Sequence, residues 1–354
     1  MERNGFQAIV YEIFTRLSAE DIVRFKCLSK NFYSELSSNA FQMMHALRRG
    51  DSVQKKLLSF KDTSIVIDDV VAGTLNVVRS KTLSFPNNVH PSNLRILSSF
   101  NGLLLVYNQG ICCQLILWNP TTRRYKVLCD EYFNYSHQRN SDTGGINFDQ
   151  FNDLKVLNIR CYRNVTTARV YSRRRESWRT INAGSVNNYG SSGYSWSTGV
   201  YADKTIYFMV SNYWYPLGER NIVAFDVLSE TFRMLHFPES IVVNPCQGHF
   251  LTIGKRLHMI VIGKSAELTA YLLRYEEEGW MKVFVFNNPR VVDYVDRRRR
   301  TNIIEDNKWL ITSIWEDMIE VDLSNELLKY LQHVDNFNGP KGALLIETTV
   351  SPID

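Results

Sequence analysis

LWNPTTRRYKVL, residues 117–128, has the form of a β-hairpin. An apolar strand end is followed by a short polar turn, and the chain then returns with large apolar side chains. Counted from Asn119, which opens the turn, the first large side chain is Tyr125, six positions later, and Leu128 follows three positions after that. Polar turn residues between two apolar runs are typical of two antiparallel strands joined by a tight turn.

The same pattern returns four times along the chain: VYSRRRESWRTI at 170–181, AFDVLSETFRML at 224–235, LLRYEEEGWMKV at 272–283 and EVDLSNELLKYL at 320–331. In every copy a large side chain stands six positions after the residue that opens the turn. These large residues are Tyr125, Trp178, Phe232, Trp280 and Leu328, at intervals of 53, 54, 48 and 48 residues. A period of about fifty residues indicates a repeat architecture in which each repeat is one supersecondary unit.

Each hairpin follows a further pair of strand-like runs. LRILSSFNGLLLVY, residues 94–107, carries Asn101 and Gly102 between two apolar runs, which is a strong signal for a tight hairpin. Four strands in every repeat predict the blades of a β-propeller. Strand-like runs at 56–67 and 74–79, together with GALLIETTV at 342–350, are expected to complete a further blade and close the ring. The expected total is about six four-stranded blades.

The first part of the chain, residues 5–47, has helical rather than strand periodicity. Three apolar residues recur at the spacing of one helix face: Ile9, Ile13 and Leu17. Ser18 followed by Asp21 is a capping pattern that opens a second helix. A third helix and a short fourth one are predicted at 30–36 and 39–47. Such a small helical unit buries little apolar surface by itself, so a partner is expected.

Part of this helical head resembles the F-box. In YEIFTRLSAEDIVRFKCLSKNFYSEL, residues 11–36, the residues that match plant versions of the motif are Glu12, Ile13, Arg16, Leu17, Arg24, Phe25, Lys26, Cys27, Leu28, Ser29 and Lys30. The opening Leu-Pro of the motif is replaced by Gly5 and Phe6, which lack the fixed Pro angle at the helix entry. Its second Pro is replaced by Ser18, an acceptable helix cap. The resemblance implies docking onto a Skp-type adaptor and, through it, a cullin–RING ubiquitin ligase.

The repeat region resembles the plant F-box-associated domain. Three segments carry this resemblance: SSFNGLLLVY at 98–107, LWNPTTRRYKVL at 117–128 and GINFDQFNDLKVL at 145–157. Together the two resemblances cover nearly the whole chain. They imply a multidomain protein of the α + all-β class, with a helical F-box at residues 1–49 and a β-propeller-like domain at 50–354.

Two groups of residues are candidate binding sites. If the head docks an adaptor, its apolar residues must divide between its own core and the partner surface, and the candidates are Ile9, Ile13, Leu17, Ile22, Phe25, Leu28, Ser29 and Phe32. In a four-stranded blade the short turns share one face, so the long connections share the other. The connections at 182–197 and 211–220 are rich in Tyr, Trp, Ser, Gly and Asn, as paratopes are. The candidates for binding a target, or alternatively for packing over the propeller end, are Tyr189, Tyr194, Trp196, Tyr213, Trp214 and Tyr215.

Composition and charge set bounds on the partners. The formal net charge of +5 is small for 354 residues and predicts no nucleic-acid binding. The apolar stretch at 102–118 is interrupted by polar residues, and no secretory signal is visible. We therefore expect no membrane association, reduced cysteines, and a cytoplasmic or nuclear location. The four arginines at 297–300 are either a nuclear-import signal or a solvated loop between blades.

The sequence contains no constellation typical of an enzyme. Its seven histidines form no zinc-binding pair, and it has no nucleophile elbow, phosphate-binding glycine loop or dinucleotide fingerprint. No catalytic residue, metal or cofactor is expected. An adaptor-binding head joined to a rigid platform predicts the non-catalytic substrate receptor of a Skp–cullin–F-box ubiquitin ligase, which presents a target protein for ubiquitination and degradation. Two alternatives stay open: a propeller binding protein whose F-box no longer docks, and a propeller enzyme.

Overall fold

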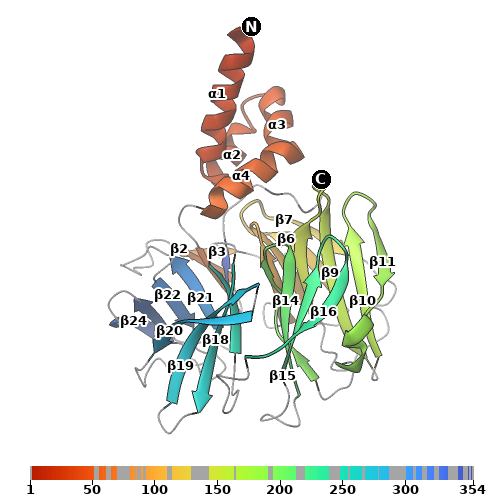
Figure 1. Cartoon of the computed structure of the whole chain (residues 1–354). Helices are drawn as coiled ribbons and strands as arrows, with labels where there is room; N and C mark the ends of the chain where they lie inside the picture. The colour runs from red at the N-terminus through yellow and green to blue at the C-terminus, as the bar shows by residue number, and fades with distance from the viewer. Residues whose placement is uncertain are drawn as a thin grey trace.

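The computed structural model shows a helical head standing on one end of a ring of β-sheets (Figure 1). The structure describes residues 2–51, 56–60, 65–69, 80–83, 85, 89–90, 93–109, 114–128, 143–162, 165–189, 194–212, 220–238, 248–253, 256–264, 268–277, 279–286, 300–305, 308–312, 317–322, 327–333, 342–345, 350 and 352.

Four helices form the head: α1 (Glu2–Arg16), α2 (Ala19–Phe25), α3 (Lys30–Ser37) and α4 (Asn39–Asp51). The predicted cap of the second helix is confirmed, because the Ser18 hydroxyl accepts the Asp21 backbone N–H at 3.1 Å. Ser29 caps α3 in the same way and accepts the Phe32 N–H at 3.1 Å. Residues 5–6 lie inside α1, so the expectation that they form the entry to this helix is wrong.

The core of the head is small and aromatic. Its buried residues are Phe14, Ile22, Leu36 and Phe41. The Phe14 ring meets the rings of Phe25 and Phe32 edge-on, with centroids 5.0 and 5.4 Å apart. Burying one such side chain contributes about 1.5–3 kcal/mol. The folded state of the head therefore depends on each of these few side chains.

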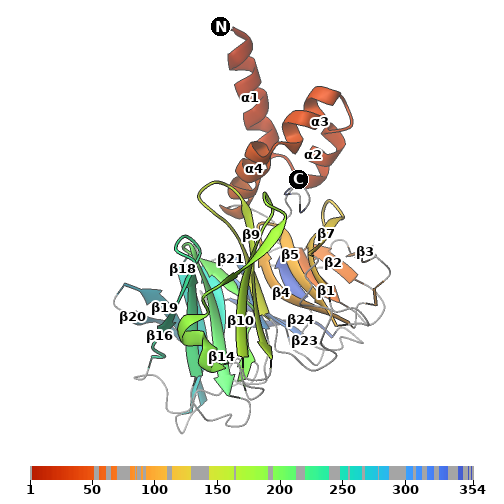
Figure 2. The same ribbon diagram turned by 90° about the vertical axis from the view of Figure 1, so that its right-hand side faces the viewer.

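The described strands form six antiparallel sheets, which confirms the expected propeller of about six blades (Figures 1 and 2). Blade 1 contains β25 (Gly342–Leu345), β1 (Lys56–Phe60), β2 (Ile65–Asp69) and β3 (Ser80–Leu83). Blade 2 contains β4 (Leu94–Phe100), β5 (Leu103–Asn108), β6 (Gln114–Asn119) and β7 (Arg124–Leu128). Blade 3 contains β8 (Thr143–Phe148), β9 (Leu154–Tyr162), β10 (Val165–Ser172) and β11 (Ser177–Ile181). Blade 4 contains β12 (Tyr194–Trp196), β13 (Val200–Ala202), β14 (Thr205–Asn212), β15 (Arg220–Asp226) and β16 (Thr231–Leu235). Blade 5 contains β17 (Gly248–Ile253), β18 (Arg256–Lys264), β19 (Leu268–Glu276) and β20 (Gly279–Phe286). Blade 6 contains β21 (Arg300–Glu305), β22 (Lys308–Thr312), β23 (Asp317–Asp322) and β24 (Leu327–His333).

Blade 1 joins the two ends of the repeat region. β25 pairs antiparallel with β1, and the strand order of this sheet is β25–β1–β2–β3. The expected closure by the segment at 342–350 is therefore confirmed. The run at 74–79 lies outside the described residues, and the outer strand of the blade is β3.

The period of the sequence has a simple structural cause. In four hairpins the large residue pairs across the ladder with the residue just before the one that opens the turn: Trp118–Tyr125, Tyr171–Trp178, Phe225–Phe232 and Val321–Leu328. In the hairpin of blade 5, Trp280 pairs with Tyr275. The residue that opens the turn also holds it. Asn119 Oδ1 accepts two backbone N–H groups at 2.9 and 3.1 Å, and Asp226 Oδ1 accepts two at 2.9 and 2.8 Å. The contacts that form each hairpin join residues a few positions apart in the chain. The hairpins can therefore be recognised from the sequence.

The inner strand of blade 4 is interrupted, because β12 and β13 both pair with β14. The segment between them, residues 197–199, is bonded to the inner strands of two other blades. Gly199 N–H donates to Leu97 O at 3.0 Å in blade 2, and Thr143 Oγ1 in blade 3 donates to Ser197 O at 2.6 Å. Three blades are therefore tied together by hydrogen bonds to the backbone of this segment.

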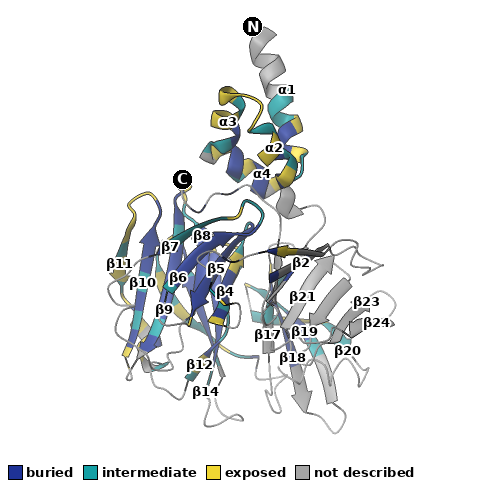
Figure 3. Ribbon diagram, turned by 180° about the vertical axis from the view of Figure 1, so that it is seen from behind, coloured by how far each residue is buried: buried dark blue, intermediate teal, exposed yellow. Residues whose placement is uncertain are grey.

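Helix α4 fixes the head to the propeller (Figure 2). Ala46 is buried in an apolar cluster with residues of blades 2 and 3 and with Val350, and Figure 3 shows β5, β6 and β9 of those blades buried along most of their length. Asn119 Nδ2 donates to the Val350 carbonyl at 2.8 Å. Since Asn119 opens a short turn, the head stands on the end of the propeller that carries the short turns. The connections from one blade to the next leave the strands at the opposite end.

We predict that Gly199→Ala strongly destabilises the propeller. A Cβ at this position would lie 2.3 Å from the Gly144 carbonyl oxygen, a backbone atom that cannot give way. Gly184→Ala is the control, because a Cβ there meets no atom within 4 Å and only the φ of +49° is unfavourable. We expect a loss of at least about 3 kcal/mol for Gly199→Ala and about 1 kcal/mol for Gly184→Ala, measured by thermal and urea unfolding. Equal losses would contradict the proposed close packing at the centre.

Candidate functional site

The head leaves a large share of its apolar side chains in solvent. Ile9, Ile13 and Leu28 are 61%, 53% and 66% exposed. Six of the eleven exposed large apolar residues in the described part of the chain lie in the head, although the head is much the smaller unit. Exposed apolar residues gathered on one small unit indicate an interaction surface.

The remaining residues predicted to bind an adaptor are less exposed or have a structural role within the head. Ile22 is fully buried in the head core, so its inclusion among surface candidates is corrected. Leu17, Phe25 and Phe32 are partly buried and pack against the same core. Ser29 is exposed, and its hydroxyl caps α3. The structure therefore brings the eight residues into one unit but leaves only some of them accessible.

Three further exposed apolar residues of the head were missed at the level of sequence: Val23, Tyr33 and Met44. Val23 follows the buried Ile22 directly, and Met44 precedes the buried His45. Their exposure depends on which faces of α2, α3 and α4 pack together. A short helix with apolar residues on several faces gives no periodic signal that would decide this.

A charged contact holds α1 against α4. Glu12 Oε1 accepts hydrogen bonds from Arg48 at 2.5 Å and from Arg16 at 2.9 Å, and Arg48 also donates to Thr15 Oγ1 at 2.9 Å. The hydrogen bonds from Arg48 and then Arg16 lower the pKa of Glu12 to about 2. Glu12 therefore remains ionised at every pH at which the protein is expected to work. It connects the exposed helix to the one that carries the head.

The residues predicted to bind a target are placed differently from expectation. Trp196 is only 3% exposed and lies in β12, where its ring packs edge-on against Phe208 with centroids 5.9 Å apart. Tyr189 ends the 3₁₀ helix η4 (Gly184–Tyr189), and its ring lies 5.1 Å from that of Tyr194. These three residues pack between blades 3 and 4, so their assignment to an exposed binding loop is corrected. The cause is that the segment supplies an inner strand of blade 4.

The other half of this prediction falls outside the described residues. Tyr213, Trp214 and Tyr215 belong to the segment between β14 and β15 that the structure does not describe. Of the four consecutive arginines, Arg300 begins β21 and the three before it are likewise undescribed.

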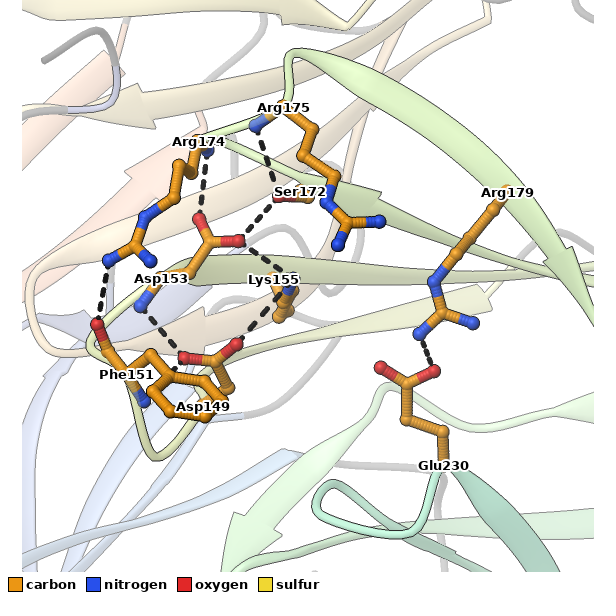
Figure 4. Close-up of polar contacts among 9 residues, drawn as sticks. All are labelled: Asp149, Phe151, Asp153, Lys155, Ser172, Arg174, Arg175, Arg179 and Glu230. Atoms are coloured by element: carbon orange, nitrogen blue, oxygen red, sulfur yellow. Dashed lines mark hydrogen bonds and ion pairs between the residues drawn. The ribbon is translucent and has the colours of Figure 1, made fainter.

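Blade 3 carries a network of polar contacts on the end of the propeller that faces the head (Figure 4). Asp149 Oδ1 accepts the backbone N–H groups of Phe151 and Asp153 at 2.8 and 2.9 Å. Asp153 in turn accepts a hydrogen bond from the Ser172 hydroxyl and one from the Arg174 N–H, the latter at 2.9 Å. The β8–β9 turn is thereby fastened to the β10–β11 turn.

Lys155 forms an ion pair with each of the two carboxylates of this network. Its Nζ lies 2.7 Å from Asp153 Oδ2 and 3.5 Å from Asp149 Oδ2. Burial by itself raises the pKa of Asp153, but the hydrogen bonds from Lys155, Ser172 and the Arg174 N–H outweigh it and lower that pKa. Carboxylates that accept hydrogen bonds from a lysine and from backbone N–H groups stabilise the conformation of a turn. Their geometry favours a structural role over general acid–base chemistry.

Among the residues that the structure describes, no group of three or more His, Cys, Asp or Glu is arranged to hold a metal ion. No described helix is long and apolar enough to cross a membrane.

We predict that Trp196→Ala destabilises the propeller by about 3–5 kcal/mol, because it empties a buried aromatic site. Phe151→Ala is the control: this side chain is 65% exposed, and its removal should change stability by no more than about 0.5 kcal/mol. Chemical unfolding of the purified variants measures both. A Trp196→Ala variant as stable as the parent chain would return this residue to the list of surface candidates.

A second prediction concerns Asp153. Its folded pKa lies below the unfolded value of about 3.9, so the carboxylate adds stability at neutral pH that disappears as the pH falls through these two values. Asp153→Asn should therefore melt at a lower temperature than the parent chain at pH 7. The difference in melting temperature should shrink as the pH is lowered from 5 towards 3. A difference that is independent of pH would contradict the assigned ion pair.

Comparisons with known proteins identify both units. The F-box domain family matches residues 7–41, and the F-box associated beta propeller domain family matches residues 54–260. Relatives are found in Arabidopsis thaliana. F-box protein At4g22390 is 20% identical over 317 residues, which are 81% of this chain and 75% of that protein. F-box protein At1g11270 is 25% identical over 250 residues, which are 64% and 73%.

Another Arabidopsis protein with an F-box designation, At3g16210, is 24% identical over 239 residues, 66% of this chain. The match spans 60% of that relative, which is less than two thirds of its length. Among solved structures, TolB from Acinetobacter baumannii is similar at a TM-score of 0.49, with 10% identity over 87% of this chain and 72% of its own. The β-propeller domain of the Trilobed protease from Pyrococcus furiosus gives a TM-score of 0.37, with 11% identity over 75% and 73%.

The helical head, the six sheets and the two family matches agree with one another. Since the match to the propeller family alone extends over more than half of the chain, the protein belongs to the plant F-box proteins that carry an F-box associated beta propeller domain.

Proposed function

We propose that this protein is the substrate-recognition subunit of a Skp–cullin–F-box ubiquitin ligase. The head docks on a Skp-type adaptor and, through it, on a cullin, while the propeller holds a target protein. Ubiquitin is transferred to the target by other subunits, and the target is then degraded. The protein itself contributes binding and positioning, in the cytoplasm or the nucleus, and performs no covalent step.

The observation that carries the proposal is the exposed apolar surface of the head. Ile9 and Ile13 lie one helical turn apart on α1, and both side chains are more than half exposed. An isolated protein gains nothing by leaving such side chains in water, whereas a partner that covers one gains about 1.5–3 kcal/mol. The surface belongs to a unit that matches the F-box family. The adaptor is therefore the partner best suited to it.

The fixed attachment of the head supports a positioning role. Ala46 of α4 is buried against the propeller, and Arg48 of the same helix binds Glu12 and Thr15 of α1. The exposed helix is thus connected to the propeller through side-chain contacts as well as through the chain itself. A head that keeps its orientation holds a captured protein at a set distance and angle from the ligase subunits that the adaptor binds.

The test is the affinity of the full chain for a purified Skp-type adaptor. We predict that the double variant Ile9→Asp/Ile13→Asp binds at least about tenfold more weakly, because losing about 1.4 kcal/mol is a factor of ten and each buried side chain contributes more than that. Both positions are exposed, so the head should still fold. Val165→Asp is the matched control, since Val165 is an equally exposed apolar residue on the propeller. Titration calorimetry measures the affinities, and circular dichroism checks the fold.

If the folded Ile9→Asp/Ile13→Asp variant binds the adaptor as well as the parent chain, the proposed docking surface is wrong. If the parent chain itself binds no adaptor, the ligase role fails. The protein is then a propeller binding protein that acts without a ligase, the alternative left open by the sequence.

A further inference from the structure

A strongly basic surface lies on the head-facing end of blades 2 and 3, outside the residues used above. The c–d turn of blade 2 and the two turns of blade 3 supply it together. Six cationic side chains that are at least partly exposed belong to it: Arg123, Arg124, Lys126, Lys155, Arg174 and Arg175. Three carboxylates belong to it: Asp149, Asp153 and Glu176. The surplus of three positive charges compares with +5 for all 354 residues, so more than half of the net charge of the protein is concentrated here.

The three carboxylates are already engaged within the surface. Lys155 contacts Asp149 and Asp153, and Lys126 on β7 pairs with Glu176 in the β10–β11 turn. The last of these pairs crosses from blade 2 to blade 3 and brings the basic turns of the two blades together.

Arg123, Arg174 and Arg175 are exposed, and no carboxylate of the described residues pairs with any of them. Arg174 donates from Nη2 to the Phe151 carbonyl at 3.0 Å, which orients one edge of its guanidinium. In Figure 4 the Arg174 and Arg175 side chains leave the turn on different sides. A guanidinium in this situation binds carboxylate or phosphate oxygens in bidentate fashion.

Phe151 adds an apolar contact beside these cations. Its side chain is 65% exposed although its backbone is held firmly, because its N–H donates to Asp149 Oδ1 and its carbonyl accepts from Arg174. A rigid turn that presents an aromatic ring next to arginines offers both an anchor and charge. Aromatic residues and Arg are the types most enriched among the residues that dominate binding energy.

We propose that this surface binds an acidic peptide segment of the captured target protein. Assigning the segment to the target rests on the proposed function, whereas acidic recognition rests on the charges alone. The exposed residues Ile9 and Ile13 lie on α1, which rises away from the propeller (Figures 1 and 2). A protein docked there has no need to cover the turns of blade 3. The acidic segment and the adaptor are thus held at the same time.

The experiment measures fluorescence anisotropy of labelled peptides with the full-length chain. One peptide alternates Glu with Gly and Leu, a second replaces Glu by phosphoserine, and a third replaces it by Gln. The parent chain should bind the first two and not the third, with an affinity that falls as salt rises. The tighter of the two acidic peptides tells whether carboxylate or phosphate is the natural group.

Arg174→Glu/Arg175→Glu should weaken binding of the acidic peptides at least about tenfold at low salt. The control is Lys204→Glu/Arg233→Glu, which makes the same change in charge on exposed residues of blade 4. Phe151→Ala should weaken binding without changing its dependence on salt. Adaptor affinity should stay the same in all three variants, so failure of this proposal is separate from failure of adaptor docking.

Equal losses in the two charge-reversal variants would mean that only the overall charge matters, and the proposal would be overturned. It would equally be overturned if neither acidic peptide binds the parent chain. A loss of adaptor affinity in Arg174→Glu/Arg175→Glu, with peptide binding unchanged, would assign the surface to the adaptor instead of the target.

Discussion

The antiparallel pairing of β25 with β1 is the contact on which the rest of the molecule depends. Each blade of a propeller buries its faces only against its two neighbours, so an open ring leaves two blades half covered. Pairing of residues 342–345 with 56–59 removes both open faces at once. Val350, a few residues beyond β25, then packs with Ala46 and accepts a hydrogen bond from Asn119. Ring closure and attachment of the head are therefore one structural event.

The two ends of the propeller have different chemistry because the strands alternate in direction. One end collects the short turns, and their lengths are fixed by side chains such as Asn119 and Asp226 that bind the backbone of their own turn. Short fixed turns can present charge at set positions, as Arg174 and Arg175 do. The head occupies the same end, so a bound adaptor and a basic surface are presented side by side. The opposite end carries the connections from one blade to the next.

Much of this architecture could be predicted from the sequence because its causes are local. The cap at Ser18 and the pairing of Trp118 with Tyr125 each involve residues a few positions apart. The roles of Ile22 and Trp196 could not be predicted in the same way. Ile22 is buried because α2 packs into one core with residues of α1, α3 and α4, and Trp196 is buried because its segment supplies part of the inner strand of blade 4. Apolar residues show that something will be covered, but the partner that covers them is a tertiary contact.

The pairing of β25 with β1 also sets an order of events during synthesis. The helices of the head are built from contacts between residues close in the chain, so they can form while the rest is still being made. β1 has to wait with one edge unpaired until almost all the blades have been translated. An unpaired edge is prone to join strands of other chains. A ribosome that stalls late thus releases a chain with a finished head and an open ring, able to occupy an adaptor without presenting a complete platform.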